Sequence, residues 1–271
     1  MQDSTHSSDT DSAESETRRG GVSGAGVVPV CVSPSGEVYV LLGRERYVRN
    51  WSSSLKWSGF EGSNSGKEDV VDNAARELCE ETAGVLFEKE KVEASLRNDE
   101  FIAKISVKSY RTKKRHVTFL KLIKYDPRIV VRFGETVFAL SELERCASKL
   151  NLLNGNGRWG KDNEANDGGW SVITNERGNV ANTRMAIETI LRETNLEHHP
   201  AVRVERDDSG VVKKVAVASE FVEKSRVRLW KLSELRRALE LGQGYTNFEL
   251  RPLFCIVARV ICDTLPPYVR P

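Results

Sequence analysis

One short stretch constrains the fold of this chain more than any other. Residues 62–84 read GSNSGKEDVVDNAARELCEETAG, and neither glycine nor proline occurs between Asp69 and Thr82. Most residues in this interval are compatible with a helix. At about 100° per residue, glutamates spaced i, i+3 and i+4 share one arc of such a helix. The spacing therefore predicts an acidic helix face formed by Glu77, Glu80 and Glu81.

A neighbouring arc of the same helix is apolar and can dock onto a sheet. It consists of Val71, Ala74, Ala75 and Leu78. The carboxylates on the acidic arc repel one another, and a bound divalent cation would remove that repulsion. Because an all-oxygen cluster suits a hard ion, we expect Mg²⁺ or Mn²⁺. For an arbitrary E-x-x-E-E segment, a solvated acidic face would be the better interpretation.

The residues around the helix favour the metal site, because they complete a longer pattern. The matching residues are Gly62, Glu68, Arg76, Glu77, Leu78, Glu80 and Glu81. Their spacing is that of the Nudix box, G-x5-E-x7-R-E-U-x-E-E-x-G-U with U an aliphatic residue. The chain therefore resembles a Nudix hydrolase.

One position departs from this pattern. The family has a glycine two residues after the paired glutamates, where a left-handed residue ends the helix. Here Ala83 occupies that position and the glycine follows as Gly84. We expect the helix to run one residue further before Gly84 stops it, with the carboxylates upstream unaffected.

The resemblance implies a fold and an activity. The expected fold is an α/β/α sandwich around a mixed β-sheet. The expected reaction is hydrolysis of a pyrophosphate linkage in a nucleoside diphosphate joined to another group. The family's divalent ions would be held by Glu77, Glu80 and Glu81 together with the Gly62 carbonyl, and would activate a bound water.

Two further residues of the box have implied supporting roles. Arg76 would orient the glutamates through charge-assisted bonds, and Glu68 would support the helix from behind the ligands. A Nudix-fold binding or regulatory module without turnover is the alternative function. The paired glutamates, whose loss usually accompanies loss of turnover, are all present, and this favours the enzyme.

An additional carboxylate is expected in the last third of the chain. Nudix proteins commonly close the site with a strand that bears such a group, followed by a W-x-x-x-x-L segment. Trp230 to Leu235 supplies that segment, and Glu223 is the candidate carboxylate. Glu220 and Glu135 are the alternatives. The general base stays open between a box glutamate and Glu223.

The remaining sequence predicts the domain organisation. Residues 1–24 are rich in Ser, Asp and Glu, so we expect a disordered tail. A Nudix domain would span residues 25–265, followed by a short tail at 266–271. If Glu223 belongs to the site, the C-terminal half of this domain contains a large insertion at about residues 127–219.

Periodicity and turn signals place the other elements. The expected elements are two β-rich runs flanking a turn at 33–36, strands at 101–107 and 116–124, a surface loop at 151–169, an amphipathic helix at 182–195 and a buried helix at 253–261.

The substrate is indicated less directly. Lys113, Lys114 and Arg115 lie at the centre of a basic stretch, residues 104–116, that could follow an RNA backbone or clamp a polyphosphate. A solvated turn is the alternative interpretation, and His116 is expected to be structural. Segments near Glu223 show a faint resemblance to Nudix decapping enzymes of large DNA viruses. We therefore rank capped RNA or another polyphosphate above a single nucleotide.

Trp57, shortly before the box, could stack a base, although packing is the more common role for such a tryptophan. The five cysteines show no C-x-x-C pairing and are typical of reduced thiols. We expect a cytoplasmic protein, with a nuclear location also open. The most apolar stretch, residues 253–261, contains Arg259, so no membrane partner is expected.

Overall fold

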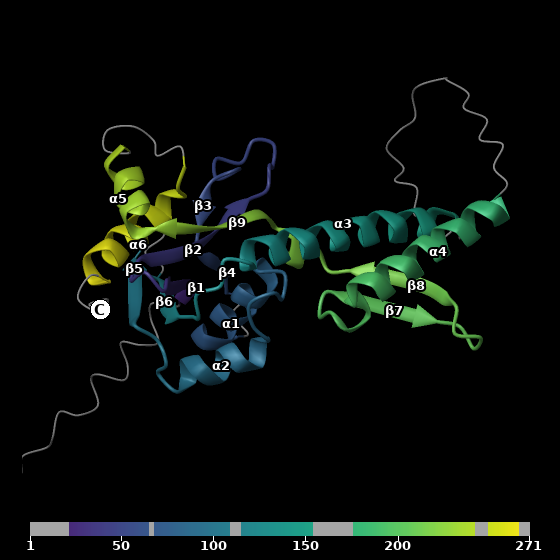
Figure 1. The fold of residues 1–271 in the computed structure, drawn as a ribbon, viewed down its shortest axis with the longest axis horizontal. Coiled ribbons are helices and arrows are strands. Elements are labelled where there is room, and N and C mark those ends of the chain that lie inside the picture. Colours follow the sequence, from purple (N-terminus) through teal and green to yellow (C-terminus); the bar gives the residue numbers. More distant parts are fainter. Residues whose placement is uncertain (1–21, 65–67, 109–114, 154–175, 242–248, 266–271) are drawn as a thin grey trace, which may run out of the picture.

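The computed structural model describes residues 22–64, 68–108, 115–153, 176–241 and 249–265. A seven-stranded mixed sheet forms its centre (Figure 1). The strands are β1 (Val22–Val32), β2 (Val38–Glu45), β3 (Trp57–Ser58), β4 (Phe60–Ser63), β5 (Ala103–Lys108), β6 (Arg115–Leu122) and β9 (Lys224–Lys231). Strand β1 runs parallel to β6 and antiparallel to β2 and β4, and β9 lies antiparallel along β2.

Helices cover both faces of this sheet. Alternate residues of a strand point to opposite faces, and Val27 and Val28 of β1 belong to two different buried clusters. The Val27 face is covered by α1 (Val70–Glu81), with α2 (Lys89–Arg97) outside it; the Val28 face is covered by α5 (Leu232–Leu241) and α6 (Pro252–Thr264) (Figure 1). The expected α/β/α sandwich around a mixed sheet is confirmed.

A long arm projects from the sandwich between β6 and β9 (Figure 1). It consists of α3 (Ile129–Leu153), α4 (Glu176–Thr194), the 3₁₀ turn η2 (Leu196–His198) and the ribbon of β7 (Val202–Arg206) and β8 (Val212–Val217). A second 3₁₀ turn, η3 (Ser219–Val222), leads from the arm into β9. The arm lies where the insertion at residues 127–219 is expected; that it is an insertion stays a prediction.

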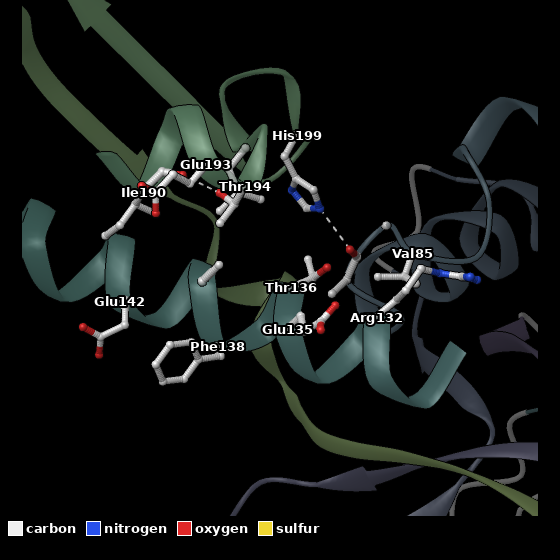
Figure 2. A pocket seen from close by; sticks show the side chains of 14 residues that line it. Val85, Arg132, Glu135, Thr136, Phe138, Glu142, Ile190, Glu193, Thr194 and His199 are labelled. Atoms are coloured by element: carbon white, nitrogen blue, oxygen red, sulfur yellow. Dashed lines mark hydrogen bonds between the residues drawn. The ribbon is translucent and has the colours of Figure 1, made fainter. Parts of the chain in front are cut away.

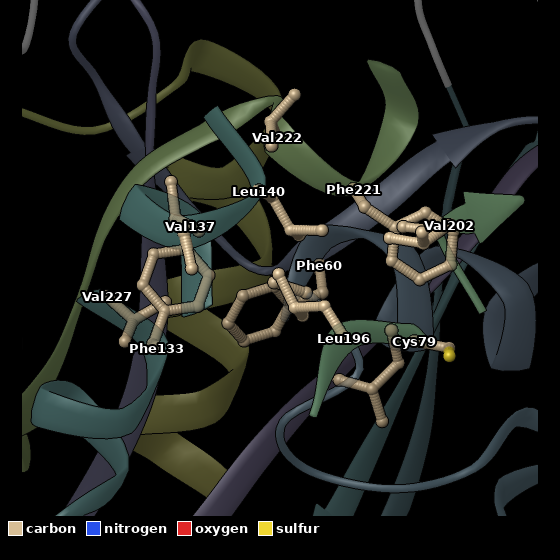
Figure 3. Packing of buried hydrophobic residues seen from close by; sticks show 14 of the residues in the cluster. Phe60, Cys79, Phe133, Val137, Leu140, Leu196, Val202, Phe221, Val222 and Val227 are labelled. Atoms are coloured by element: carbon tan, nitrogen blue, oxygen red, sulfur yellow. The ribbon is translucent and has the colours of Figure 1, made fainter. Parts of the chain in front are cut away.

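The base of the arm is part of the main core (Figure 3). Phe133, Val137 and Leu140 of α3 are buried in one cluster with Phe60 of β4 and Val227 of β9. Burial of side chains of this size stabilises the contact by roughly 1.5–3 kcal/mol each. The first turns of α3 are therefore fixed against the same strands that carry the box.

The box helix forms as its sequence predicts. The Asp69 side chain caps it by accepting hydrogen bonds from the backbone N–H groups of Val71 and Asp72, at 2.8 and 2.9 Å. Ala75 and Leu78 are fully buried against the sheet, and Val71 packs at the edge of the same cluster.

The expected end of this helix is wrong. Helix α1 stops at Glu81 instead of running on, because Ala83 itself adopts a left-handed conformation with φ 52°, followed by Gly84 with φ 65°. The Gly84 N–H donates to the Cys79 carbonyl at 2.8 Å, and the Thr82 hydroxyl donates to the Leu78 carbonyl at 2.6 Å. These bonds satisfy the last carbonyls of the helix.

Substitutions at two glycines should therefore change stability in opposite directions. Gly84→Ala forces a Cβ into the left-handed region, 3.1 Å from Nε2 of His199, and should lower the free energy of unfolding by about 1–2 kcal/mol. Gly134→Ala, in open space on exposed helix α3, should raise it by roughly 0.5–1 kcal/mol. Urea unfolding of both variants measures the difference; effects of equal sign would contradict the left-handed turn.

Three other sequence expectations have clear outcomes. Residues 22–24, expected in the tail, form the start of β1, because Gly24 pairs with both Ser63 and His116. The buried helix expected at 253–261 is confirmed within α6. Helix α3 ends at Leu153, so it includes the first three residues of the loop expected at 151–169. Residues 1–21, 154–175 and 266–271 lie outside the described residues. In the described part of the chain, no helix has the length and apolar character needed to cross a bilayer.

Candidate active site

Glu77 of α1 lies directly against Gly62 of β4. A Cβ added to Gly62 would come within 2.1 Å of Oε1 of Glu77, so only glycine leaves room for this carboxylate. Asn73 fixes the helix over the strands: its Oδ1 accepts from the Ala25 N–H at 2.7 Å and its Nδ2 donates to the Ser63 carbonyl at 3.3 Å. The helix, β1 and β4 thus position Glu77 as a unit.

Arg76 connects three carboxylates of the box. Its Nε lies 3.1 Å from Glu68, its Nη2 lies 2.8 Å from Oε1 of Glu77 and its Nη1 lies 2.7 Å from Oε2 of Glu80. Charge-assisted bonds of this kind fix side-chain geometry strongly. The contacts agree with the orienting role that the resemblance implies for Arg76, and they join Glu68 to the same guanidinium group.

Glu81 points to a different set of partners. Its Oε2 accepts from the Glu61 N–H at 2.7 Å, and its Oε1 lies 2.8 Å from Nζ of Lys224, the first residue of β9. The same Nζ lies 2.6 Å from Oε1 of Glu45 in β2, which also contacts Nη1 of Arg251 at 3.0 Å. Burial alone would lower the pKa of Lys224, but the carboxylates of Glu81 and Glu45 outweigh it and raise that pKa.

Sequence reasoning missed Lys224 and Glu45. The two residues face each other in the register of β9 on β2, across 179 positions of sequence. The one available signal is that Lys224 directly follows the candidate carboxylate Glu223 on a strand.

Burial is the main cause that raises the pKa values of the site glutamates, and neighbouring glutamates add to it. Burial raises the pKa of Glu77 to about 7 against the opposing charge of Arg76, and Glu80 and Glu223 add repulsion. Burial also raises the pKa of Glu80, to which Glu220 and Glu68 contribute. The pKa of Glu223 is raised by burial and by repulsion from Glu45, Glu220 and Glu80. Repulsion between carboxylates thus adds to pKa shifts that burial dominates.

The donor chemistry of the cluster fits a hard divalent ion. Among the described residues, no group of three His, Cys, Asp or Glu side chains is already arranged to hold a metal. Glu77 and Glu80 turn to Arg76, and Glu81 turns to Lys224. Nevertheless, the site offers oxygen donors only and has unrelieved repulsion, which Mg²⁺ or Mn²⁺ would remove. Glu77 and Glu80, with the Gly62 carbonyl nearby, would have to exchange contacts with Arg76 for the ion.

The structure separates the three candidates for the additional carboxylate. Glu223 follows η3 directly before β9, and its charge acts on Glu77. Glu220 in η3 acts on Glu80 and on Glu223. Glu135 instead lies on α3 and lines a pocket of about 830 Å³ beyond the end of α1 (Figure 2). Glu223 and Glu220 thus act electrostatically on the box glutamates, and their place in the site stays a prediction.

The two tryptophans near the box occupy different environments. Trp57 meets Trp230 edge-on at 5.7 Å between ring centroids and packs with the cluster under α6, on the sheet face opposite α1. This arrangement favours packing over base stacking. Trp51 is 38% exposed, stacks with the Arg251 guanidinium at 5.7 Å and lines a pocket of about 440 Å³ together with Glu45 and Glu223. Sequence reasoning did not predict that Trp51 lines this pocket.

The described end of the basic stretch, Arg115 and His116, begins β6 beside β1. Lys113 and Lys114 are outside the described residues, and Arg115 is exposed at the start of β6. The next residue, His116, pairs with Gly24, which also pairs with Ser63. Nε2 of His116 lies 2.9 Å from Oε2 of buried Glu61, consistent with a structural role.

Replacing Gly62 tests how closely Glu77 is held. In Gly62→Ala the new Cβ displaces the Glu77 carboxylate, so Mn²⁺ affinity should fall by about 10–100-fold. Isothermal titration calorimetry with Mn²⁺ measures this. Gly36→Ala is the control, because Gly36 has φ 80° and no neighbour within 4 Å of its Cβ position; it should cost stability and leave Mn²⁺ affinity unchanged. Equal Mn²⁺ affinity in the two variants would remove Glu77 from the metal site.

Comparisons with known proteins give low overall similarity. No family model matches the chain, and no curated protein matches it. Among solved structures, an Ap4A hydrolase binary complex from C. elegans is 21% identical with a TM-score of 0.27, covering 39% of this chain and 68% of its own. A MutT/nudix family protein from Enterococcus faecalis is 21% identical with a TM-score of 0.29, covering 39% and 38%.

A third similar structure is the NUDIX domain of Shewanella oneidensis NrtR complexed with ADP ribose. It is 16% identical, has a TM-score of 0.28, and covers 41% of this chain and 66% of its own. The names of the last two structures include the Nudix family, and residues 62–84 of this chain resemble the box of that family. At these scores, function has to be inferred from the residues of the site.

Proposed function

We propose that this protein is a Nudix pyrophosphohydrolase that uses Mg²⁺ or Mn²⁺ to cleave a nucleoside diphosphate linked to another group. One observation carries the proposal: the Glu77 carboxylate lies directly against Gly62 of β4, and Arg76 joins it to Glu80 and Glu68. A purely solvated acidic face would have neither the burial of Glu77 nor its strongly raised pKa.

The chain's own groups divide the work. Glu77 and Glu80, with the Gly62 carbonyl, would hold the metal, which when bound neutralises phosphate charge and lowers the pKa of a water ligand. Arg76 keeps Glu77 and Glu80 on one side of the helix. Glu223 is the favoured general base, because both oxygens of Glu81 already have donors whereas Glu223 lines the pocket beside Trp51.

The pocket and the basic stretch suggest the substrate class. The exposed ring of Trp51 offers a surface on which a base can stack. Arg115 marks the described end of a basic stretch on the box side of the sheet. These features support a highly charged substrate, capped RNA or another polyphosphate, over a single nucleotide.

A substrate panel tests the proposal. The protein is incubated with Mg²⁺ or Mn²⁺ and capped RNA, NADH, ADP-ribose, dinucleoside polyphosphates or inositol pyrophosphates, and products are identified by mass spectrometry. Cleavage at a pyrophosphate bond that stops when the metal is chelated is the expected result. Tight binding of one compound without any product would instead favour the binding or regulatory module.

A further inference from the structure

Lys224 is a fully buried lysine whose ammonium group lies beside the box. Its side chain is 0% exposed, and its Nζ contacts Oε1 of Glu81 at 2.8 Å and Oε1 of Glu45 at 2.6 Å. Gly43 makes room for the aliphatic stem, since a Cβ there would lie 3.0 Å from the Cγ and Cδ atoms of Lys224. The strand register therefore places a positive charge at a defined point inside the protein.

The position of this ammonium group is fixed mainly from the Glu45 side. Glu45 and Lys224 face each other across β2 and β9, and Arg251 and Ser58 also contact Glu45. Nζ additionally donates to the Ser58 hydroxyl at 3.2 Å. A buried charge is costly to leave unpaired, and the ammonium group of Lys224 has two carboxylate partners here, Glu45 and Glu81.

The contact with Lys224 disfavours a metal ion beside Glu81, because the buried ammonium group would repel a second cation there. One oxygen of Glu81 faces Lys224 and the other accepts from the Glu61 N–H, whereas Glu77 and Glu80 have Arg76 as their shared partner. The side chain of Arg76 is partly exposed, with 25% of it accessible to solvent, whereas the side chain of Lys224 is fully buried. The three box glutamates are therefore not equivalent toward a cation.

We propose that Lys224 is a fixed internal cation that holds Glu81 as a positioning residue and thereby limits the divalent ions bound by the box to those held by Glu77, Glu80 and their neighbours. The inference rests on the proposed function in one respect, namely that the box is the cation site. It changes the role expected for Glu81 from metal ligand to an anchor of α1 on β4 and β9.

The role of Lys224 is tested by titrating the full chain with Mn²⁺ in the absence of substrate and measuring bound Mn²⁺ by electron paramagnetic resonance. Lys224→Met frees Glu81 and should either raise Mn²⁺ affinity at least about tenfold or add one bound ion. Glu81→Gln in the otherwise unchanged chain should leave Mn²⁺ affinity within about threefold. The double variant should lose the gain seen with Lys224→Met, because that gain depends on the freed Glu81 carboxylate.

Matched variants separate this effect from general electrostatics. Lys231→Met removes a charge from the same strand, but from an exposed pair with Glu37, and should not change Mn²⁺ binding. If Lys224→Met does not fold, the Glu81→Gln comparison still decides: a loss of Mn²⁺ affinity as large as that in Glu80→Gln overturns the inference.

The two proposals fail in different ways. An unchanged chain that binds no Mn²⁺ contradicts the proposed function, while a gain of Mn²⁺ binding in Lys224→Met would still support the role of Lys224. Equal Mn²⁺ binding with and without Lys224 overturns the inference and leaves the proposed function standing if the unchanged chain binds Mn²⁺.

Discussion

Replacing Glu80 by glutamine should reduce Mg²⁺- or Mn²⁺-dependent hydrolysis by about a thousandfold, the scale expected when a principal electrostatic element of a site is removed. The change leaves the shape of the side chain intact and removes one negative charge. Glu80 lies on the helix face with 18% of its side chain exposed, so the fold should persist. Turnover of the best substrate in the panel, with circular dichroism of the variant, measures both parts of the prediction.

A matched control is Glu240→Gln, because Glu240 is exposed on α5, on the other face of the sheet. It should retain full turnover. Near-normal turnover in Glu80→Gln would remove Glu80 from the metal site, and a loss of helical signal would show that the variant reports on folding and not on catalysis.

The box helix could be predicted because its determinants are local. Asp69 as cap, the apolar arc of Ala75 and Leu78 and the acidic arc all lie within a few turns of one segment. The end of the helix could not be predicted with the same rules. Ala83 adopts a left-handed conformation in a turn whose Ala83 carbonyl lies 2.9 Å from Nε2 of the distant His199, a tertiary contact that the rule favouring glycine does not include.

The charge partners of the site depend on strand register, which the sequence does not reveal. Glu223 could be proposed from its place before the Trp230 segment, and the structure brings its charge onto Glu77. The pairing of Lys224 with Glu45 requires knowing that β9 lies against β2, and this follows from the packing of a whole sheet. The location of Trp51 beside the site also depends on tertiary packing, which the sequence does not reveal.

Changing Lys113, Lys114 and Arg115 together to alanine should weaken binding of long capped RNA and flatten its dependence on salt by up to about three units of slope. Each Lys or Arg that contacts a phosphate releases a counterion, so its removal reduces the slope. The described part of the stretch supports this geometry, because Arg115 is exposed beside the strand pair that leads to Gly62. Filter binding at several salt concentrations gives the slope.

The control and the substrate length decide where these charges act. Arg203, Lys213 and Lys214 are exposed on the β7–β8 ribbon, so changing them to alanine removes the same charge at a distant place and should leave the salt slope unchanged. If these charges contact the RNA outside the catalytic pocket, turnover of a small cap analogue should change little in the first variant. Equal losses on the analogue and on long RNA would place the basic residues at the catalytic pocket or in folding. No loss on either would identify them as a solvated turn, and a single nucleotide would then become the better substrate class, since the charges that favour a long polyphosphate would have no function in binding.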